Sequence, residues 1–542
     1  MRHGIIRRVA LFNLSAASLI ALPGCAPIQP DPNSREDQLT GALDGTVIDA
    51  FFYAFGPYEF ARSMQALSGQ IDVGDTLVSE EALADVAKRA GDDTKVLINR
   101  HIHVRDLADE RIRSVTAPNN DTLYTSAVLE LSKTPVRLTL PNSGDRYLSV
   151  ALMDMFTDQT MVGHAENGGS AGTYLIVGPD SPVKDGPDVI RMPSNDVWLL
   201  ARTFVAGVDD LDAARAVQSG IVVEPVDTEA KPRLFNTVAP PEMEPRSFLA
   251  LTNEVLGRSP SHPQVARAAT FADKGIVPGD TSVWDGLSLR SRAAWNAWLP
   301  HSLDMLRKGL SRSQDRPGWN APPLILGDYG NNDLVRTAIA LIGFGALKTQ
   351  DARYFRTETD AAGEALSGTS SYRMVIPPAG VPVKAFWSLS VYQPDADGRL
   401  FFFEVPIDRH SINSGSSDLV KRPDGSIVLH LSRERPEEED VVGADTRRTV
   451  RSYLPHLSPR RAGDRRQLER AVAGKAEIKV PPLDARKARH DCLLPGPQAA
   501  SRQSADSGYS PPPRASRKAR LKHGLATERN GPTMPGKQPC WF

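Results

Sequence analysis

The chain contains 542 residues, with 64 Lys and Arg against 65 Asp and Glu, and 40% of its residues are hydrophobic. This composition is typical of globular proteins and excludes wholesale disorder or a fibrous repeat. The length predicts two or three domains. The sequence has only three cysteines, which excludes a disulfide framework or a metal site built from cysteines. It contains no Walker loop, dinucleotide-binding glycine pattern, HExxH or EF-hand motif, which argues against nucleotide-driven or zincin chemistry.

The first 25 residues have the pattern of an export signal. Three arginines in residues 1–8 precede a mostly apolar stretch at residues 9–22, which is shorter than the ~18 residues that a membrane span needs. The ending Leu-Pro-Gly-Cys at residues 22–25 resembles a bacterial lipobox, in which Cys25 becomes the lipidated first residue of the mature chain. The alternative is an ordinary signal peptide that leaves Cys25 unmodified. We expect a protein on the periplasmic side of the cell envelope, held at the membrane by a lipid on Cys25.

The segment from Val441 to Phe542 differs in composition from the rest of the chain. It contains 21 Lys and Arg, 8 Asp and Glu, and 12 Pro, whereas the residues before it carry an excess of acidic side chains. Such a segment buries too little apolar surface to fold, so we predict a basic, disordered tail at residues 441–542. A basic arm for nucleic acid or an anionic membrane is one interpretation. We favour a reading frame that is lost near Asp440, and we expect no nucleic-acid partner.

Residues 26–41 form a predicted polar linker, and residues 42–225 form the first predicted domain. Its start, from Ala42 to about Arg113, has helical periodicity. The buried stripe of the first helix is predicted to consist of Val47, Phe51, Ala54 and Tyr58. Ser79 is a plausible N-cap for a second helix at Glu80–Arg89.

After Pro118 the hydrophobic period changes to two. In Val136–Leu140 apolar side chains alternate with Arg137 and Thr139, as a strand with one buried face requires. Further strands are predicted at Tyr124–Leu131, Arg146–Phe156, Gly172–Gly178 and Val197–Val205, followed by a short helix at Asp210–Val217. Short strands separated by brief polar turns favour an antiparallel sandwich.

Residues 226–350 form a predicted helical insert, and residues 351–440 form a second β domain. The insert helices are expected at Glu244–Leu256, His262–Asp273, Ser291–Gly309 and Asp333–Lys348, the last capped by Asn332 or Asp333. The strands are expected at Tyr372–Ile376, Val383–Tyr392, Leu400–Val405 and Ser426–Leu431, with turns at Asp397-Gly398 and Asp424-Gly425. The predicted fold class is therefore α+β, mainly β, with two antiparallel β-sandwiches separated by helices.

Two groups of residues resemble the signatures of known domains. Pro118–Tyr124, Arg146-Tyr147 and Met153–Thr157 are similar to the domain of unknown function catalogued as number 1254. Gly318-Trp319 and Ala385–Leu389 resemble its usual partner, number 1214. The resemblance implies an immunoglobulin-like sandwich, a helical insert and a jelly roll, and it implies no established reaction. The closing strand of the second domain is missing from the pattern, so we interpret this domain as truncated at about residue 440.

Two histidines suit a metal site. His101 and His103 lie on one face if their segment is extended, and Asp121 or Asp154 would supply a third ligand for a divalent metal such as zinc or iron. The alternative is a pair of ordinary histidines in a connection between a helix and a strand.

Five residues are candidates for binding a ligand at the mouth of the first sandwich: Asp121, Arg146, Asp154, Asp158 and His164. Asp121 serves equally well to fix the turn in its Asn-Asn-Asp-Thr sequence. Arg146 would bind an anionic ligand or one of these aspartates.

Other patterns favour structural roles. Gly168–Gly172 matches the Gly-x-Ser-x-Gly pattern of serine hydrolases, but a strand follows it where the nucleophile elbow needs a helix, so we interpret it as a glycine-rich hairpin. Aromatic residues predicted to lie in the core are Trp295, Trp298, Trp319 and Phe386-Trp387, with sugar stacking as the alternative.

Two functional hypotheses remain open. The first is an envelope protein that binds a small molecule, a glycan or a protein partner, with a homo-oligomer as one form of partner. The second is a metal-assisted enzyme that uses His101, His103 and an aspartate.

Overall fold

The computed structural model describes residues 45–71, 97–113, 116–313, 318–395, 399–405, 409–432 and 476–479. The predicted signal at residues 1–25, the linker, the second N-terminal helix and the tail except residues 476–479 lie outside these ranges. No helix in the described ranges is both long and apolar enough to cross a bilayer. The described residues combine helices with mainly antiparallel sheets, which confirms the α+β class.

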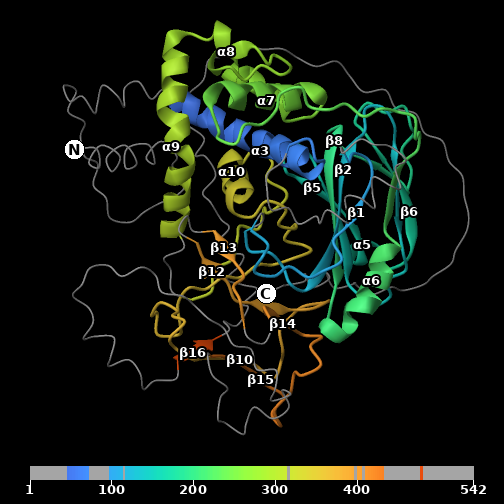
Figure 1. The fold of residues 1–542 in the computed structure, drawn as a ribbon, viewed down its shortest axis with the longest axis vertical. Coiled ribbons are helices and arrows are strands. Elements are labelled where there is room, and N and C mark those ends of the chain that lie inside the picture. Colours follow the sequence, from blue (N-terminus) through green and yellow to red (C-terminus); the bar gives the residue numbers. More distant parts are fainter. Residues whose placement is uncertain are drawn as a thin grey trace, which may run out of the picture. The chain divides into compact units, whose positions relative to one another are not determined.

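Two sheets form the body of the first domain (Figure 1). Their strands are β1 (Ile102–His103), β2 (Thr122–Glu130), β3 (Val136–Leu140), β4 (Leu148–Met153), β5 (Gln159–Gly163), β6 (Gly172–Val177), β7 (Val189–Arg191), β8 (Asp196–Phe204) and β9 (Val222–Pro225). The five-stranded sheet has the order β1-β2-β8-β4-β5, and the four-stranded sheet has the order β7-β6-β3-β9. All neighbouring strands are antiparallel except β6 and β7.

The strand pattern predicted for Val136–Leu140 is confirmed by the burial of β3. Val136, Leu138 and Leu140 are buried, and Arg137 is exposed. These side chains form one core with residues of the five-stranded sheet, including Leu129. In contrast, β4 is buried along its whole length, because Leu347, Ala352 and Phe386 pack against its second face at Ala151 and the helical core covers Met153. Strands buried on both faces have continuous apolar sequences, so their alternation is weak.

Helix α3 (Gly45–Leu67) lies in a second core, between the five-stranded sheet and the helical insert (Figure 1). The predicted stripe of Val47, Phe51, Ala54 and Tyr58 is buried, as expected. Phe55 and Phe60 are buried too, because α7 (Pro245–Arg258), α9 (Leu289–Ser313) and α10 (Asp333–Ile342) all contact this helix. The prediction of helical structure up to Arg113 is wrong for residues 97–113, which contain β1 and irregular segments.

The remaining helices connect these layers. They are α5 (His164–Asn167), η1 (Val208–Asp210), α6 (Leu211–Ser219), η2 (Val265–Lys274) and α8 (Val283–Gly286), of which η1 and η2 are 3₁₀ helices. The predicted cap of α10 is confirmed, since Asn332 Oδ1 accepts a hydrogen bond from the Val335 amide at 3.2 Å. Helix α10 ends at Ile342 and not at Lys348, because glycines at 343 and 345 disfavour its continuation. Residues 345–354 then run along the five-stranded sheet, where Gly345 lies against Trp198 and bonds Arg202.

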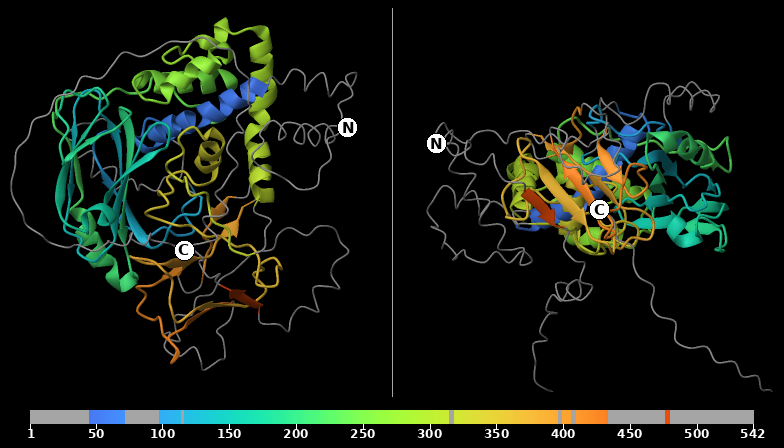
Figure 2. Two further views of the ribbon diagram at one scale, coloured as in Figure 1. Left: turned by 180° about the vertical axis from the view of Figure 1, so that it is seen from behind. Right: turned by 90° about the horizontal axis from the view of Figure 1, so that it is seen from below.

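The second domain contains three small sheets (Figure 2). Its strands are β10 (Tyr372–Ile376), β11 (Ser388–Ser390), β12 (Gln393–Pro394), β13 (Leu400–Phe401), β14 (Ser411–Asn413), β15 (Ile427–Leu431) and β16 (Ala476–Lys479). The sheets are β15-β10-β16, β11-β14 and β12-β13. Strand β10 has the predicted bounds, whereas β11, β13 and β15 are shorter than the strands predicted there. Strand β16 pairs in parallel with β10, so this part of the tail forms a strand where we predicted disorder.

Candidate functional site

The two histidines of the predicted metal site lie together, but Asp121 does not join them. Their ring centres are 4.6 Å apart. The Val223 amide donates to His101 Nδ1 at 3.0 Å, and His103 Nδ1 lies 2.8 Å from Thr125 Oγ1. His103 lies opposite Thr125 in the sheet. Asp121 precedes Thr125 by four residues, which corresponds to about 13 Å along an extended strand.

The structure therefore does not bring Asp121 to His101 and His103, and a metal site there stays a prediction. Within the described ranges, no group of three or more His, Cys, Asp or Glu side chains is placed to hold a metal ion. The physical reason is that the Asp121 carboxylate is directed to the second domain.

Asp121 joins the two domains. Its side chain is 1% exposed. Its Oδ1 accepts hydrogen bonds from Ser411 Oγ and Asn413 Nδ2, both at 2.8 Å, and its Oδ2 accepts one from Ser388 Oγ. Burial raises the pKa of Asp121, although these three donors act to lower it. The backbone amide of Asp121 bonds Asn119 Oδ1, so the residue also fixes the turn that the sequence indicated.

Arg146 binds an aspartate, but not one of those we predicted. Its Nη1 and Nη2 each donate to a carboxylate oxygen of Asp210 at 2.6 Å. Nη1 also donates to the Phe204 carbonyl at 2.7 Å. The Arg146 guanidinium holds the pKa of Asp210 below its usual value. This ion pair fixes the start of α6 against the sheet.

Asp154 and Asp158 hold the turn between β4 and β5 against the helical insert. Asp154 Oδ1 accepts from the amides of Phe156 and Asp158, and its Oδ2 lies 3.1 Å from His262 Nε2. His262 Nδ1 accepts from the Gln264 amide, so the proton of the neutral ring lies on Nε2 and is donated to Asp154. Asp158 accepts from the Tyr329 amide at 2.7 Å. Burial, and then the nearby Asp154, raise the pKa of Asp158.

His164 is the first residue of α5. Its Nδ1 is buried and has no hydrogen-bond partner among the described residues. The Gly-x-Ser-x-Gly segment follows, with α5 before it and β6 after it. This order is the reverse of a nucleophile elbow, and the serine, Ser170, is exposed. The predicted binding residues therefore occupy separate places, and most of them bind other protein groups.

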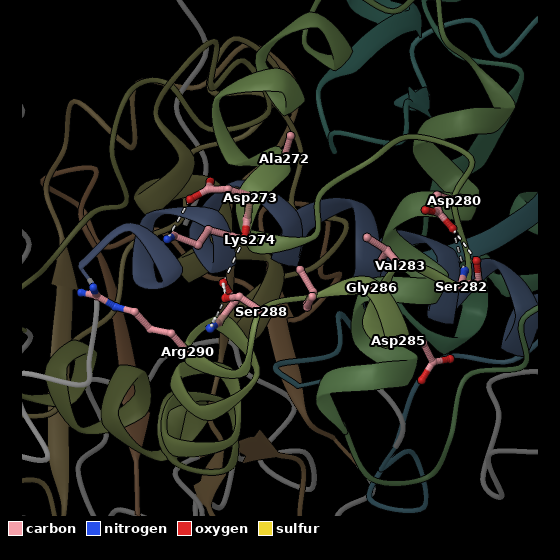
Figure 3. A pocket seen from close by; sticks show the side chains of 12 residues that line it. Ala272, Asp273, Lys274, Asp280, Ser282, Val283, Asp285, Gly286, Ser288 and Arg290 are labelled. Atoms are coloured by element: carbon pink, nitrogen blue, oxygen red, sulfur yellow. Dashed lines mark hydrogen bonds and ion pairs between the residues drawn. The ribbon is translucent and has the colours of Figure 1, made fainter.

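An open depression of about 900 Å³ lies between η2, α8 and α9 (Figure 3). Most of its charged side chains bind their neighbours. Lys274 Nζ pairs with Asp273 at 2.9 Å, and Asp280 accepts from the Ser282 amide and hydroxyl. Asp285 pairs with Arg246. These matched charges make the depression a weaker candidate than the cluster described next.

A polar cluster that the sequence analysis missed lies between the two domains. Arg202 of β8 is paired across the sheet with Tyr124 of β2 on one side and with Ser149 of β4 on the other. Its Nη1 donates to the Tyr354 hydroxyl at 3.0 Å, and its Nη2 donates to the Gly345 carbonyl at 2.9 Å. We refer to Tyr124, Tyr147, Ser149, Arg202, Asp351 and Tyr354 as the arginine cluster.

The charge of Arg202 is not matched by a carboxylate. No acidic side chain of the described residues lies within ion-pair distance, and the buried Nε of Arg202 has no hydrogen-bond partner there. In contrast, Arg146 and Arg258 each pair with an aspartate. Burial acts to lower the pKa of Arg202 and the hydrogen bond to Tyr354 acts to raise it, and an arginine guanidinium stays charged at neutral pH.

The carboxyls beside the arginine cluster have raised pKa values. Asp351 is 3% exposed, and its buried Oδ1 has no hydrogen-bond partner within the described chain. Burial raises the pKa of Asp351 to about 6, against the opposing charge of Lys348. Partial burial, and then Asp351, raise the pKa of Glu166 to about 7, although much of Glu166 reaches solvent. Perturbed carboxyls near an unmatched cation are typical of functional sites.

Apolar side chains line one side of the arginine cluster. Tyr147 packs edge-on against Phe386 with ring centres 5.6 Å apart, and Phe204 lies 4.1 Å from the same ring. Leu347 belongs to the same apolar group. The side chains of Tyr124, Arg202 and Tyr354 are half-buried, so solvent reaches the polar part of the cluster.

One feature of the sequence could have revealed this cluster. Arg202 is the only charged residue of β8 after its first residue, in the otherwise largely apolar run from Val197 to Phe204. A charge inside a strand that is buried on both faces indicates a polar environment. The sequence does not indicate that Tyr354, 152 residues later, supplies part of it.

The fold and this cluster define a two-domain α+β protein with a polar site at the domain junction. The family described as "Protein of unknown function (DUF1254)" matches residues 98–225, and that described as "Protein of unknown function (DUF1214)" matches residues 351–460. The resemblance to both domains, N-terminal and then C-terminal, is confirmed. The second match extends past residue 440, where we placed the end of that domain. Arg202 lies in the first match, and Asp351 and Tyr354 lie in the second.

No curated protein matches the chain. Among solved structures, the VPA0106 protein from Vibrio parahaemolyticus is similar, with a TM-score of 0.52 and 18% identity over 76% of this chain and 93% of that one. An uncharacterized protein from Burkholderia cenocepacia has a TM-score of 0.34 and 13% identity over 78% of this chain and 92% of that one. The similarity to the VPA0106 protein supports the fold and carries no information about function.

Proposed function

We propose that this chain is an exported lipoprotein of the bacterial envelope that binds a small molecule at the junction of its two domains. The observation that carries the binding proposal is the unmatched charge of Arg202 in a half-buried cluster. A cation withdrawn from water costs free energy unless a partner compensates it. A ligand that supplies this partner would therefore bind favourably, and domain junctions are common places for such sites.

The export part of the proposal rests on residues 1–25, which carry the basic start, the apolar stretch and Cys25. We further propose that the first domain is an immunoglobulin-like sandwich and the second a jelly roll. The core that the five-stranded and four-stranded sheets share supports the first of these shapes.

A thermal-shift screen tests the binding function. The wild-type protein and Arg202→Gln would be screened against neutral, anionic and cationic small molecules. We expect at least one compound that raises the melting temperature of the wild type by several degrees and that of Arg202→Gln by much less. The control is Arg137→Gln, since Arg137 makes an exposed ion pair with Glu224 on the other sheet. If no compound distinguishes the wild type from Arg202→Gln, the proposed binding function is wrong.

Cell fractionation tests export and lipidation. The wild-type chain should be found in the membrane fraction, with residues 1–24 removed and a lipid on Cys25. The Cys25→Ser variant should remain unlipidated, and it should not give the mature form that is bound to the membrane. A wild-type chain in the cytosol that retains residues 1–25 would contradict this part of the proposal.

A further inference from the structure

We propose that the ligand of the arginine cluster is a small monocarboxylate with an apolar body. This inference rests on the proposed binding function and adds the chemical class of the ligand. Three features of the cluster carry it: the donors around Arg202, the carboxyls beside them, and the apolar side chains that complete the site.

The donors favour a carboxylate. The guanidinium of Arg202 has one buried N–H, at Nε, that no described residue accepts. Burial raises the pKa of Tyr124 and of Tyr147, so both phenols are neutral at pH 7 and add no negative charge beside Arg202. A carboxylate has only acceptors and matches charged donors better than a neutral group does.

The neighbouring carboxyls limit the ligand to one negative charge. Asp351 is buried and directly precedes Ala352, which packs in one apolar group with Tyr147, so this acid lies beside the cluster. Glu166 lies close enough to Asp351 for their charges to interact. A second anionic group on the ligand would meet these carboxyls, and like charges in a half-buried site repel each other.

The apolar side favours a hydrocarbon body over a second polar group. Phe204 and Met161 are partly buried and pack against one buried apolar group that contains Tyr147, Leu347 and Phe386, so part of their apolar surface is available to a ligand. A polar substituent against these side chains would lose its hydrogen bonds to water without replacement. Phosphate and other small inorganic anions would leave this contact unused.

Titration calorimetry at pH 7 on the full-length wild-type protein tests the inference. The probes are acetate, hexanoate and benzoate, the matching amides hexanamide and benzamide, the dianion phthalate, and inorganic phosphate. We expect hexanoate or benzoate to bind at least tenfold more tightly than its amide, than acetate, than phthalate and than phosphate. This ranking is measured on the wild type, so it does not depend on the folding of any variant.

Three variants provide a second measurement. Arg202→Gln should weaken binding of the preferred monocarboxylate at least tenfold, whereas Arg137→Gln should leave it unchanged. Asp351→Asn should narrow the difference in affinity between benzoate and phthalate, because it removes the carboxyl that repels the second charge of phthalate. Circular dichroism and the melting temperature of each variant report whether it folds.

The outcomes separate the two proposals. If an amide or phosphate binds most tightly and its binding depends on Arg202, the monocarboxylate class is wrong and the binding function stands. If hexanoate and benzoate bind equally well to the wild type and to folded Arg202→Gln, the arginine cluster is not the ligand site. If no probe binds and the thermal-shift screen also finds no compound, both proposals are wrong.

Discussion

At the residue scale, Arg258 and Arg202 show two environments of a guanidinium withdrawn from water. Arg258 is 7% exposed and donates to both carboxylate oxygens of Asp196 at 2.7 Å. Within the described part of the chain, Arg202 is half-buried and donates only to the Tyr354 hydroxyl and to the Gly345 carbonyl. The first arrangement is a self-contained ion pair, which stabilises the fold only if its hydrogen bonds are complete. The second leaves a charge available to a ligand.

Asp351 gives a pH-dependent prediction at the same scale. The folded state raises the pKa of this carboxyl from 3.8 to about 6, so folding favours its protonated form. The resulting stabilisation is fully present below about pH 4 and is lost as the pH rises through about 6. Asp351→Asn removes this titration. We subtract the unfolding free energy of the wild type from that of the variant at each pH. This difference should become more positive by about 2 kcal/mol between pH 4 and pH 8, allowing for solvent screening.

Urea unfolding at a series of pH values measures this difference. The control is Asp188→Asn, because Asp188 is exposed and its substitution should give a difference that changes little with pH. A difference between Asp351→Asn and the wild type that stays constant from pH 4 to pH 8 would show that the Asp351 carboxyl titrates normally in the folded protein.

At the element scale, helix α3 shows how packing overrides helix propensity. Gly56 lies inside this helix, where alanine is favoured by about 1 kcal/mol. A Cβ at Gly56 would lie 2.7 Å from Arg336 Cδ. Arg336 is fully buried, and its Nε donates to the Phe156 carbonyl while its Nη1 donates to Asp333. These bonds hold the side chain in place, so it has little freedom to yield.

Gly56→Ala should therefore destabilise the protein by about 2 kcal/mol, since overpacking outweighs the gain in propensity. Gly309 provides a matched control in α9, because a Cβ there would meet no atom within 4 Å. Gly309→Ala should stabilise the protein by up to about 1 kcal/mol. Chemical denaturation of the two variants measures both effects, and two shifts of the same sign would contradict the explanation.

At the scale of the whole molecule, the loop at residues 116–122 couples the two domains. The Ala117 amide donates to the Leu400 carbonyl at 2.8 Å, and the Tyr392 hydroxyl donates to the Pro118 carbonyl at 2.8 Å. Asp121 adds three hydrogen bonds from strands β11 and β14. The signature loop of the first domain is therefore also a binding surface for the second.

Asp121→Ala should weaken this coupling. The substitution removes one acceptor from each of three buried donors. Ser411 Oγ keeps Asn120 Oδ1 and Asn413 Nδ2 keeps the Val205 carbonyl, so we expect a cost of about 2 kcal/mol in the unfolding free energy. In calorimetry, the second domain should unfold at a lower temperature than the first, and proteases should cleave it sooner. Asp212→Ala is the control, since the Asp212 side chain is 97% exposed and its ion pair contributes little. A single unfolding transition at the wild-type temperature would contradict this role of Asp121.

The sequence predicted local structure well where one face of an element is buried. Strand β3 and strand β10 have the predicted bounds, because their alternating side chains report a single buried face. Strand β5 and strand β9 were missed, since they are short and carry little alternation of their own. The helical prediction was wrong at residues 97–113, because β1 forms there by pairing with β2.

The sequence by itself determined the fold class, both domain resemblances and the buried stripe of α3, since these depend on periodicity and on motifs within short segments. Only the tertiary structure decided which polar residues meet. Asp121 binds side chains almost 300 residues away, and Arg202 meets Tyr354 across the domain junction. Such contacts depend on how strands and loops from distant segments pack together, and a pattern of neighbouring residues carries no record of that packing.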